Sequence, residues 1–352
     1  MCDSSHENHS SGTRKLTVSE AVGTVIAHDI TEIRPGEFKG RAFKKGHVIK
    51  QEDVCHLQRL GKEHLYVLNI ADDEMHEDEA AYALANALIG KGVKIKGEPK
   101  EGKINIVADR DGLLKIDKEA LFEFNMLGEI MCATLHSNTI VKQGETVAAT
   151  RAIPLIVKKD IVQAAVKIGD QAGKIIEVKE IRRPKAGVVI TGNEVYYGRI
   201  KDAFAPIIKG KIEAIGGEIV GTYYAPDDES FIEARLRELL NAGADLLIIT
   251  GGMSVDPDDV TRFAIRNIGD EDITYGSAVL PGAMFLVAYL GDIPILGIPA
   301  CGMYAKTTIF DLILPRVLAG ERIARRELSE LGHGGLCKKC TECRYPVCPF
   351  GK

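Results

Sequence analysis

Uninterrupted apolar segments alternate with helical stripes along residues 184–267. The segment Leu246–Ile249 is apolar throughout, which is typical of a strand covered on both faces. Upstream, Phe204, Ile208 and Ile212 recur with the spacing that places side chains on one face of a helix. Strands and helices that alternate at short intervals predict the α/β class, with a doubly wound and mostly parallel sheet.

The pattern changes near the end of this region. Apolar segments at 284–290 and 293–298 flank Gly291-Asp292, a dipeptide that suits a hairpin turn. A last helix is expected from about Tyr304 to Leu318. Pro315 should bend this helix, because proline removes a backbone donor and clashes with the preceding turn.

The middle of the chain has a shorter period. Across residues 91–180, lysines alternate with apolar residues in strand-length runs that are divided by glycines. This alternation predicts strands with one face in water, and hence a β-rich domain with one short helix near 117–131. A further helix is expected at Ala80–Ile89. The carboxylates at 71–79 are expected to form a linker and the solvated start of that helix, where negative charge suits the dipole.

The N-terminal region contains a small unit from Lys15 to about Ile70, with an amphipathic stretch from Glu52 to Leu60. A polar segment precedes it. The chain is therefore expected to divide into a disordered tail (1–12), a small N-terminal unit (13–70), a β-rich middle domain (71–182), an α/β domain (183–325) and a cysteine-rich tail (326–352).

Composition and charge narrow the function. The formal net charge is −5, which gives no bulk attraction to nucleic acid or to an anionic membrane. No apolar run approaches the roughly 18 residues of a spanning helix, and the polar N-terminus lacks the apolar core of a signal peptide. We therefore expect a cytoplasmic protein with a small-molecule ligand. In that compartment its eight cysteines are better explained as thiols or metal ligands than as disulfides.

Polar or glycine-rich residues follow three of the predicted strands. They are Thr191-Gly192-Asn193-Glu194, Ala225-Pro226-Asp227-Asp228, and the stretch from Thr250 to Asp259. Parallel strands end at a common edge, where ligands of open α/β sheets bind. The glycines admit a phosphate or pterin near backbone N–H groups, and the carboxylates could hold a divalent cation. Alternatively, Asp228 and Asp258 are helix caps and the glycines are turn residues.

These segments resemble a known family. Thr191-Gly192-Asn193-Glu194 and the segment from Thr250 to Asp259 resemble the two signatures of the molybdopterin-binding domain of molybdenum cofactor biosynthesis proteins. Pro281-Gly282 and the segment 297–302 follow in family order, and the likeness spans about 183–322. The N-terminal unit is similar, more weakly, to the molybdopterin molybdotransferase branch. The resemblance implies binding of molybdopterin, Mo-molybdopterin or the adenylylated form.

The resemblance also implies roles for particular residues. Asp259 and Glu194 would be catalytic and would position Mg²⁺ in a molybdotransferase reaction. A homodimer is suggested by the same analogy. The cofactor-binding set would be Thr191, Gly192, Asn193, Asp228, Thr250, Gly251, Gly252, Ser254, Pro281 and Gly282.

Departures from the family favour binding over turnover. Asn193 stands in place of an aspartate, Asp256 stands where transferases often have glycine, and Ala300-Cys301-Gly302 replaces Gly-Asn-Pro. The sequence after Pro281-Gly282 also lacks the lysine that transferases often carry there. A carrier or maturation factor that passes the cofactor to a molybdoenzyme is therefore one alternative. A nucleotide pyrophosphatase-like hydrolase is the second.

The last part of the chain carries a metal-type motif. Cys337, Cys340, Cys343 and Cys348 have the spacing C-x2-C-x2-C-x4-C and are followed by Pro349, close to a bacterial ferredoxin pattern. Four thiolates bind either an iron–sulfur cluster or a zinc ion, and the spacing leaves both open. Hydrophobic anchors look sparse, so the tail is expected to be disordered without metal.

Overall fold

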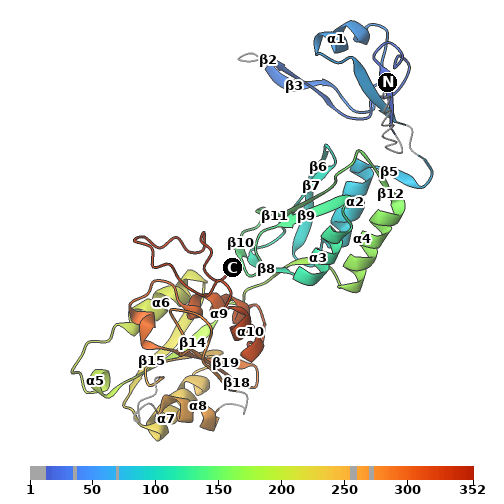
Figure 1. Cartoon of the computed structure of the whole chain (residues 1–352). Coiled ribbons are helices and arrows are strands. Elements are labelled where there is room, and N and C mark those ends of the chain that lie inside the picture. The colour runs from blue at the N-terminus through green and yellow to red at the C-terminus, as the bar shows by residue number, and fades with distance from the viewer. Residues whose placement is uncertain (1–12, 35–37, 69–70, 254–259, 269–272) are drawn as a thin grey trace, which may run out of the picture. The chain divides into compact units, whose positions relative to one another are not determined.

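The computed structural model describes residues 13–34, 38–68, 71–253, 260–268 and 273–352 (Figure 1). The chain divides into two compact units, one comprising residues up to 135 together with 141–178, the other 136–140 together with 179–352. The disordered tail predicted for residues 1–12 lies outside the described residues. Among the described residues, no helix combines the length and the apolar character needed to cross a bilayer.

The N-terminal part of the first unit is built from short strands and a helix. Its elements are β1 (Thr13–Thr17), β2 (Ile30–Arg34), β3 (Phe38–Phe43), α1 (Asp53–Arg59) and β4 (His64–Leu68). β1 pairs antiparallel with β4, and β2 with β3. Val54 and Leu57 of α1 are buried in the same core as Ile26 and Leu65, which confirms the predicted amphipathic helix.

The middle part of the first unit packs helices against antiparallel strands. Its elements are β5 (Glu74–His76), α2 (Glu77–Leu88), β6 (Val93–Lys100), β7 (Lys103–Ala108), β8 (Gly112–Ile116), α3 (Lys118–Met126), β9 (Ile130–Thr134), β10 (Ile140–Val141), β11 (Thr146–Ala152), β12 (Ile156–Lys158), α4 (Lys159–Gln171) and β13 (Ile176–Lys179). The main sheet has the order β6-β7-β11-β9, and every pairing in it is antiparallel. Leu84 of α2 and Phe124 of α3 are fully buried in the core beside this sheet.

The prediction of a single short helix beyond residue 91 is wrong, because α4 is also helical. Its buried face consists of Val162, Ala165 and Gly169, which repeat at helical spacing but are small. Ile161 and Ile168 pack against the same core, so the apolar stripe of α4 is pronounced, and the strand prediction overlooked a local helical pattern. α4 packs closely on α2, where a Cβ on Gly169 would overlap the carbonyl oxygen of Ala87.

The prediction that residues 71–79 form a linker and the solvated start of a helix holds only in part. Asp72, Asp73 and Glu79 are exposed and α2 begins at Glu77, but other residues of the stretch are paired and buried. Glu74–His76 form β5, which pairs antiparallel with β12. Glu74 is 3 % exposed, and its carboxylate lies 2.9 Å from Nζ of Lys158. Glu77 is 6 % exposed, and burial raises its pKa although Arg151 lies nearby. Tertiary packing therefore buries Glu74 and Glu77, and a run of charged residues in the sequence does not reveal such packing.

The second unit contains the predicted α/β sheet. Its elements are β14 (Lys185–Thr191), α5 (Asn193–Tyr196), α6 (Phe204–Ala214), β15 (Glu218–Ala225), α7 (Glu229–Asn241), β16 (Leu246–Thr250), α8 (Thr261–Ile268), β17 (Thr274–Tyr275), β18 (Leu286–Leu290), β19 (Ile293–Ile298), η1 (Ala300–Met303), α9 (Ile309–Leu318) and α10 (Arg325–Glu330). The strand order is β15-β14-β16-β19-β18-β17. The first four strands in this order are parallel to one another. β18 pairs antiparallel with β19, and β17 pairs antiparallel with β18.

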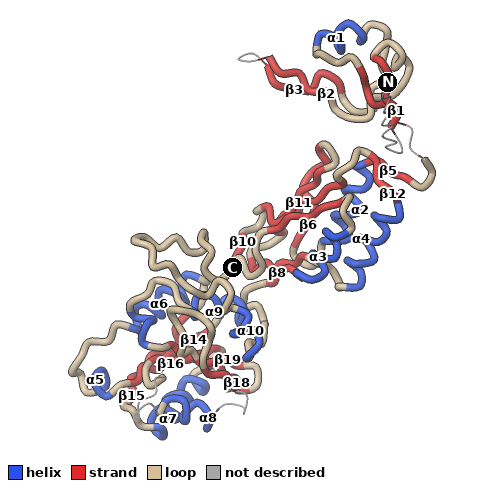
Figure 2. The backbone as a smooth tube through the Cα atoms, viewed as in Figure 1, coloured by secondary structure: helices blue, strands red, loops and turns tan. Residues whose placement is uncertain are grey.

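Helices cover both faces of this sheet, which makes it doubly wound as predicted (Figure 2). Successive side chains of a strand point to opposite faces. Val188 and Ile248 accordingly share a core with α6 and α9, whereas Val189 and Ile249 share a second core with α7 and α8. Since every residue of β16 is buried, its continuous apolar sequence reflects this two-sided cover.

Two predictions for the end of the α/β region have different outcomes. The hairpin is confirmed, because Leu290 pairs with Ile293 and Gly291 adopts a φ of 58°. The last helix starts later than the predicted Tyr304. Thr308 forms a capping box with Asp311, and α9 begins only at Ile309. The prediction begins too early because the loop before the helix also contains residues that favour helix.

The cysteine-rich tail has more hydrophobic anchors than predicted. Phe350 is 4 % exposed and belongs to the core formed with α6 and α9. Tyr345 packs against this core with its ring 6.5 Å from the ring of Phe350. The view that anchors are sparse in this tail is therefore wrong. Tyr345 and Phe350 are separated by Pro346-Val347-Cys348-Pro349, and two prolines in so short a segment exclude the helix or strand periodicity that would mark a buried stripe.

The contact between α2 and α4 is testable through Gly169. We expect Gly169→Ala to lower the free energy of unfolding by about 2 kcal/mol, because the added methyl group must push α4 away from the Ala87 carbonyl. Chemical denaturation followed by circular dichroism measures the change.

Gly210 provides the matched control, because it lies within α6, is exposed, and has open space where an added methyl group would lie. Gly210→Ala should raise the stability by roughly 0.5–1 kcal/mol through helix propensity. Equal effects of the two substitutions would contradict the close packing of α4 on α2.

Candidate functional site

The ends of the parallel strands β14, β16 and β19 lie at one edge, whereas the predicted segment 225–228 after β15 does not line the cavity found there. Ile190 lies beside Thr250 in the register of β14 and β16, and Thr250 lies beside Ile298 of β19. A cavity of about 950 Å³ opens there. Its lining includes residues from the ends of all three strands and from the loop before β18, among them Thr191, Glu194, Gly251, Gly252, Met253, Pro281, Gly282, Met284, Pro299 and Met303.

The backbone conformation at the end of β16 requires glycine at two successive positions. Gly251 and Gly252 have φ values of 85° and 56°. A Cβ on Gly251 would lie 2.5 Å from the carbonyl oxygen of Thr191, and one on Gly252 would overlap the hydroxyl of Thr261. Both glycines line the cavity, so the same residues make the turn and form a wall without side chains.

Threonine hydroxyls join the strand ends. The Thr191 hydroxyl donates to the carbonyl oxygen of Thr250 at 2.9 Å and lies 3.3 Å from the hydroxyl of Thr261. Thr250 itself is fully buried, and its hydroxyl has no hydrogen-bond partner among the described residues. Of these two predicted ligand residues, Thr191 lines the cavity, whereas Thr250 lies behind it.

The predicted acidic residues are placed differently from one another. Glu194 lies on α5, is exposed and lines the cavity. Its carboxylate sits close to Gly192, whose φ is 135°. Asp228 caps α7 by accepting from the N–H of Phe231 at 2.8 Å, which is the second role that the sequence allows for it. Asp259 and Ser254 lie outside the described residues.

Asn193 is held by the neighbouring strand end. Its backbone N–H donates to a carboxylate oxygen of Asp227 at 3.0 Å, and its side-chain oxygen accepts from the N–H of Asp227 at 3.4 Å. The residue that replaces the family's aspartate therefore ties the segment after β14 to the segment after β15. It does not belong to the lining of the cavity.

Further charged residues of the cavity were absent from the predicted set. Lys201 and Asp202 line it from the loop before α6. Asp202 caps that helix by accepting from the N–H groups of Phe204 and Ala205 at 2.7 and 3.0 Å. It also accepts from the Tyr224 hydroxyl, whose pKa is raised by burial and by the neighbouring carboxylate. The signal available in the sequence was an aspartate two residues before the apolar stripe of α6.

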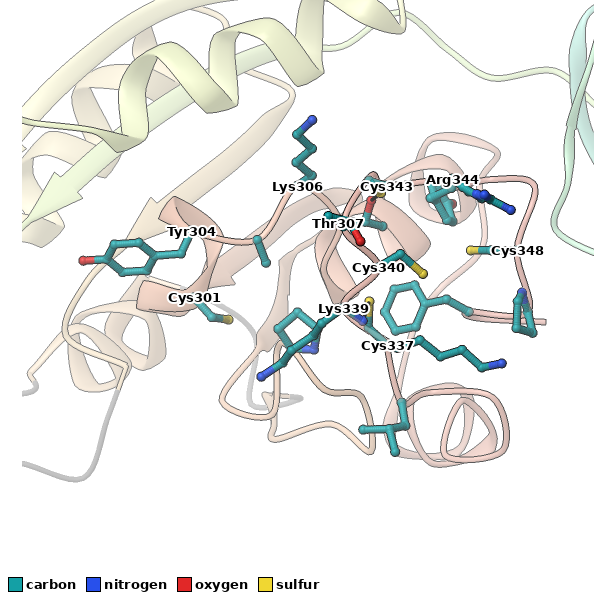
Figure 3. Close-up of a pocket in the computed structure, with 18 residues that line it drawn as sticks. Cys301, Tyr304, Lys306, Thr307, Cys337, Lys339, Cys340, Cys343, Arg344 and Cys348 are labelled. Carbon is teal, nitrogen blue, oxygen red and sulfur yellow. Dashed lines mark hydrogen bonds between the residues drawn. The ribbon is translucent and has the colours of Figure 1, made fainter.

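A second cavity, which we call the thiol cavity, has a volume of about 540 Å³ (Figure 3). Cys337, Cys340, Cys343 and Cys348 all line it, together with Cys301 from η1. The lining also carries positive charge. The basic residues are Lys306, Lys338, Lys339 and Arg344.

The thiols around this cavity have unequal environments. The Cys343 sulfur lies 3.3 Å from the hydroxyl of Thr307, and this hydrogen bond lowers the pKa of the thiol. Burial raises the pKa of Cys301. Across the described residues, no three Cys, His, Asp or Glu side chains converge as a metal ion requires. The predicted tail ligands thus surround one cavity without meeting at one point.

Comparison with known proteins assigns the α/β region to a family. Residues 187–319 match the family described as "Probable molybdopterin binding domain", and residues 15–69 match a domain of unknown function. A CinA-like protein of Mycobacterium avium is 39% identical over 77 residues, which are 22% of this chain and 18% of that protein. A CinA-like protein of Mycolicibacterium vanbaalenii is 33% identical over 95 residues, or 27% and 22% of the two chains. This chain thus spans about a fifth of the length of these relatives.

Solved structures of molybdopterin biosynthesis proteins are also similar to this chain. The Mog protein of Mycobacterium ulcerans is 21% identical with a TM-score of 0.33, and covers 38% of this chain and 94% of its own. The MoeA protein of Pyrococcus horikosii is 18% identical with a TM-score of 0.32, and covers 72% of this chain and 80% of its own. The match to residues 187–319 thus covers the α/β region, which is where this chain is similar to proteins with a probable molybdopterin-binding domain.

Proposed function

We propose that the protein binds molybdopterin, or its adenylylated form, in the cavity at the strand ends, which we call the pterin cavity. One observation carries the proposal: the segments after β14 and β16 and the Pro281-Gly282 loop, which are far apart in sequence, line the same cavity. They lie within the part of the chain that matches the molybdopterin-binding family. The role would be in synthesis, modification or delivery of the molybdenum cofactor, in the expected cytoplasmic location.

The lining suits such a ligand chemically. Met253, Met284 and Met303 offer polarizable apolar surface, which a flat heterocycle can contact. Lys201 and Lys339 supply positive charge for a phosphate. Gly251 and Gly252 leave the backbone accessible, so that N–H groups can approach an anion closely.

Catalysis would require the acidic residues. Glu194 offers carboxylate oxygens at the cavity, which are the donors that Mg²⁺ prefers. Asp259, which the family resemblance marks as the key acidic residue, would be its partner. A bound Mg²⁺ would neutralise phosphate or molybdate charge. In that case Glu194 and Asp259 orient the ligand, and the protein is a molybdotransferase.

Two alternatives compete with the transferase. A carrier or maturation factor would bind the pterin without turnover and pass it to a molybdoenzyme. This alternative is favoured by Asn193, which brings no carboxylate and is engaged with Asp227. A nucleotide pyrophosphatase-like hydrolase is the second alternative. The homodimer suggested by the molybdotransferase branch would apply to the transferase.

We also infer a metal centre in the tail. Cys337, Cys340, Cys343 and Cys348 form a donor set that fits an iron–sulfur cluster or a zinc ion in kind, and they already line one cavity. Two of them, Cys340 and Cys343, are exposed, and metal binding would require their side chains to turn towards the other two thiols.

Denaturation of the purified protein tests the binding proposal. We expect oxidised, fluorescent pterin to be released, because a ligand held in a cavity of this size co-purifies when its affinity is high. Fluorescence spectroscopy and mass spectrometry of the extract identify it. Tight binding of ADP-ribose together with no affinity for molybdopterin would instead support the hydrolase.

Substitution of the acidic residues separates transferase from carrier. Asp259→Asn and Glu194→Gln should each lower the rate of Mg²⁺- and molybdate-dependent conversion of adenylylated pterin by about 100-fold, because charge stabilisation at the reacting group is lost. The rate is measured by chromatography of the pterin products. Pterin binding should persist in both variants.

Asp292→Asn is the matched control, since Asp292 is exposed in the hairpin at the opposite end of β19 from the cavity. It should leave the rate unchanged. Wild-type protein that binds adenylylated pterin but never converts it would rule out the transferase and leave the carrier.

Metal analysis after anaerobic purification tests the tail. We expect about one zinc ion or one iron–sulfur cluster per chain, and the visible spectrum distinguishes the two. Cys340→Ser with Cys343→Ser should abolish binding, because two thiolates of four are removed. Cys55→Ser, an exposed cysteine of the other unit, should have no effect. Metal-free wild-type protein, even after reconstitution, would refute the centre.

A further inference from the structure

The pterin cavity and the thiol cavity share a wall. The residues that line both are Pro281, Cys301, Tyr304, Leu336, Cys337 and Lys339. They come from three segments: the loop before β18, η1 with the residue after it, and the start of the cysteine-rich tail. Two of the shared residues, Cys301 and Cys337, are cysteines, and Figure 3 shows both among the residues that line the thiol cavity.

The tail is joined to the pterin cavity by backbone hydrogen bonds. The N–H of Cys337 donates to the carbonyl oxygen of Leu280 at 2.9 Å, and the N–H of Leu280 donates to that of Gly335 at 2.8 Å. Leu280 directly precedes Pro281-Gly282, which line the pterin cavity. The first ligand of the cysteine motif and the pterin-side loop therefore belong to one hydrogen-bonded piece of backbone.

The rest of the tail is fixed at separate points on the same unit. Cys343 contacts the hydroxyl of Thr307, and the Tyr345 hydroxyl donates to the carbonyl oxygen of Asp311 at 3.4 Å. Phe350 is buried, and the N–H of Gly351 donates to the carbonyl oxygen of Gly334 at 3.0 Å. Cys340, which lies between these anchors, is exposed, so a metal ion from solvent can reach this thiol.

Cys301 adds a thiol from outside the tail to the lining of the thiol cavity. It reaches the cavity from η1, directly after β19, and is only partly buried. It also lies within Ala300-Cys301-Gly302, where this chain departs from the Gly-Asn-Pro of the family it resembles. A thiol therefore lies where the pterin cavity meets the four tail thiols. Thiolate clusters of this kind select zinc, copper(I) or iron–sulfur centres over magnesium or calcium.

We propose that a thiolate-bound metal centre in the tail forms part of the pterin site, so that metal loading and pterin binding are thermodynamically linked. The proposal rests on the proposed function, because it takes the larger cavity to be the pterin site. Metal binding cross-links the tail and restrains the side chain of Cys337, whose backbone Leu280 already holds, and this lowers the ordering cost of pterin binding. Cys301 lies at the boundary and transmits the effect.

The expected linkage is positive and reciprocal. We expect the metal-loaded protein to bind pterin at least about 10-fold more tightly than the metal-free protein, within the range of ordinary coupling between sites. By the same thermodynamic cycle, pterin must raise the affinity for the metal by the same factor. This reciprocity is not shared by a tail whose metal centre merely docks another protein.

The experiment uses the full chain and measures the Kd of pterin by fluorescence titration in three states: metal-free, zinc-loaded, and reconstituted with iron and sulfide. Cys340→Ser with Cys343→Ser should bind pterin like the metal-free wild type in every state, because neither residue lines the pterin cavity. Cys55→Ser is the control and should retain the full response. Cys301→Ala should keep the metal of the four tail thiols and lose most of the difference between states.

Each outcome bears on a different proposal. A tighter Kd in one loaded state supports the linkage and identifies the metal centre as zinc or iron–sulfur. Equal pterin affinity in all states, with metal bound, overturns the linkage and leaves pterin binding intact. Failure of both metals to bind also overturns it. Absence of pterin binding in every state refutes the proposed function itself, and the linkage with it.

Discussion

The parallel register of β14, β16 and β19 is the constraint on which the rest of the second unit depends. Because these strands run in the same direction, their last residues lie side by side, with Thr250 between Ile190 and Ile298. The strands are covered by helices on both faces and must remain apolar until they leave the sheet. Polar side chains are therefore concentrated at the ends of these strands, as with Thr191 and Thr250, and in the loops beyond them. The position of the pterin cavity follows from this rule.

The glycine pair illustrates how fold and site impose the same residue. Gly251 and Gly252 have positive φ values, and each would collide with Thr191 or Thr261 if it carried a side chain. Their presence is therefore explained by the fold before any ligand is considered. The stronger argument for a site is the convergence of Thr191, Gly251 and Pro281 on one cavity, since nothing in the packing of a single loop requires it.

Much of the α/β region could be predicted because its signals are local. The continuous apolar run of β16, the stripe of α6 and the Gly291 hairpin each carry their periodicity within a few residues. Elements whose character depends on distant partners were misjudged. Glu74 and Glu77 are buried by β12 and by Arg151, and α9 begins where Thr308 caps it. α4, by contrast, was missed although its apolar stripe is local. For the site, the motifs identified the edge, but Lys201, Asp202 and Lys339 join the cavity only through tertiary structure.

The cysteine-rich tail shows the same limit from the opposite side. The spacing of its cysteines predicts a metal site, but it does not predict that the tail contacts the α/β domain. Backbone bonds to Leu280, the burial of Phe350 and the approach of Cys301 make it a wall of the neighbouring cavity instead. A metal centre that only stabilised the tail would need no fifth thiol at that wall. Its position, in a segment that departs from the family pattern, is most simply explained if metal and pterin are sensed by the same piece of structure.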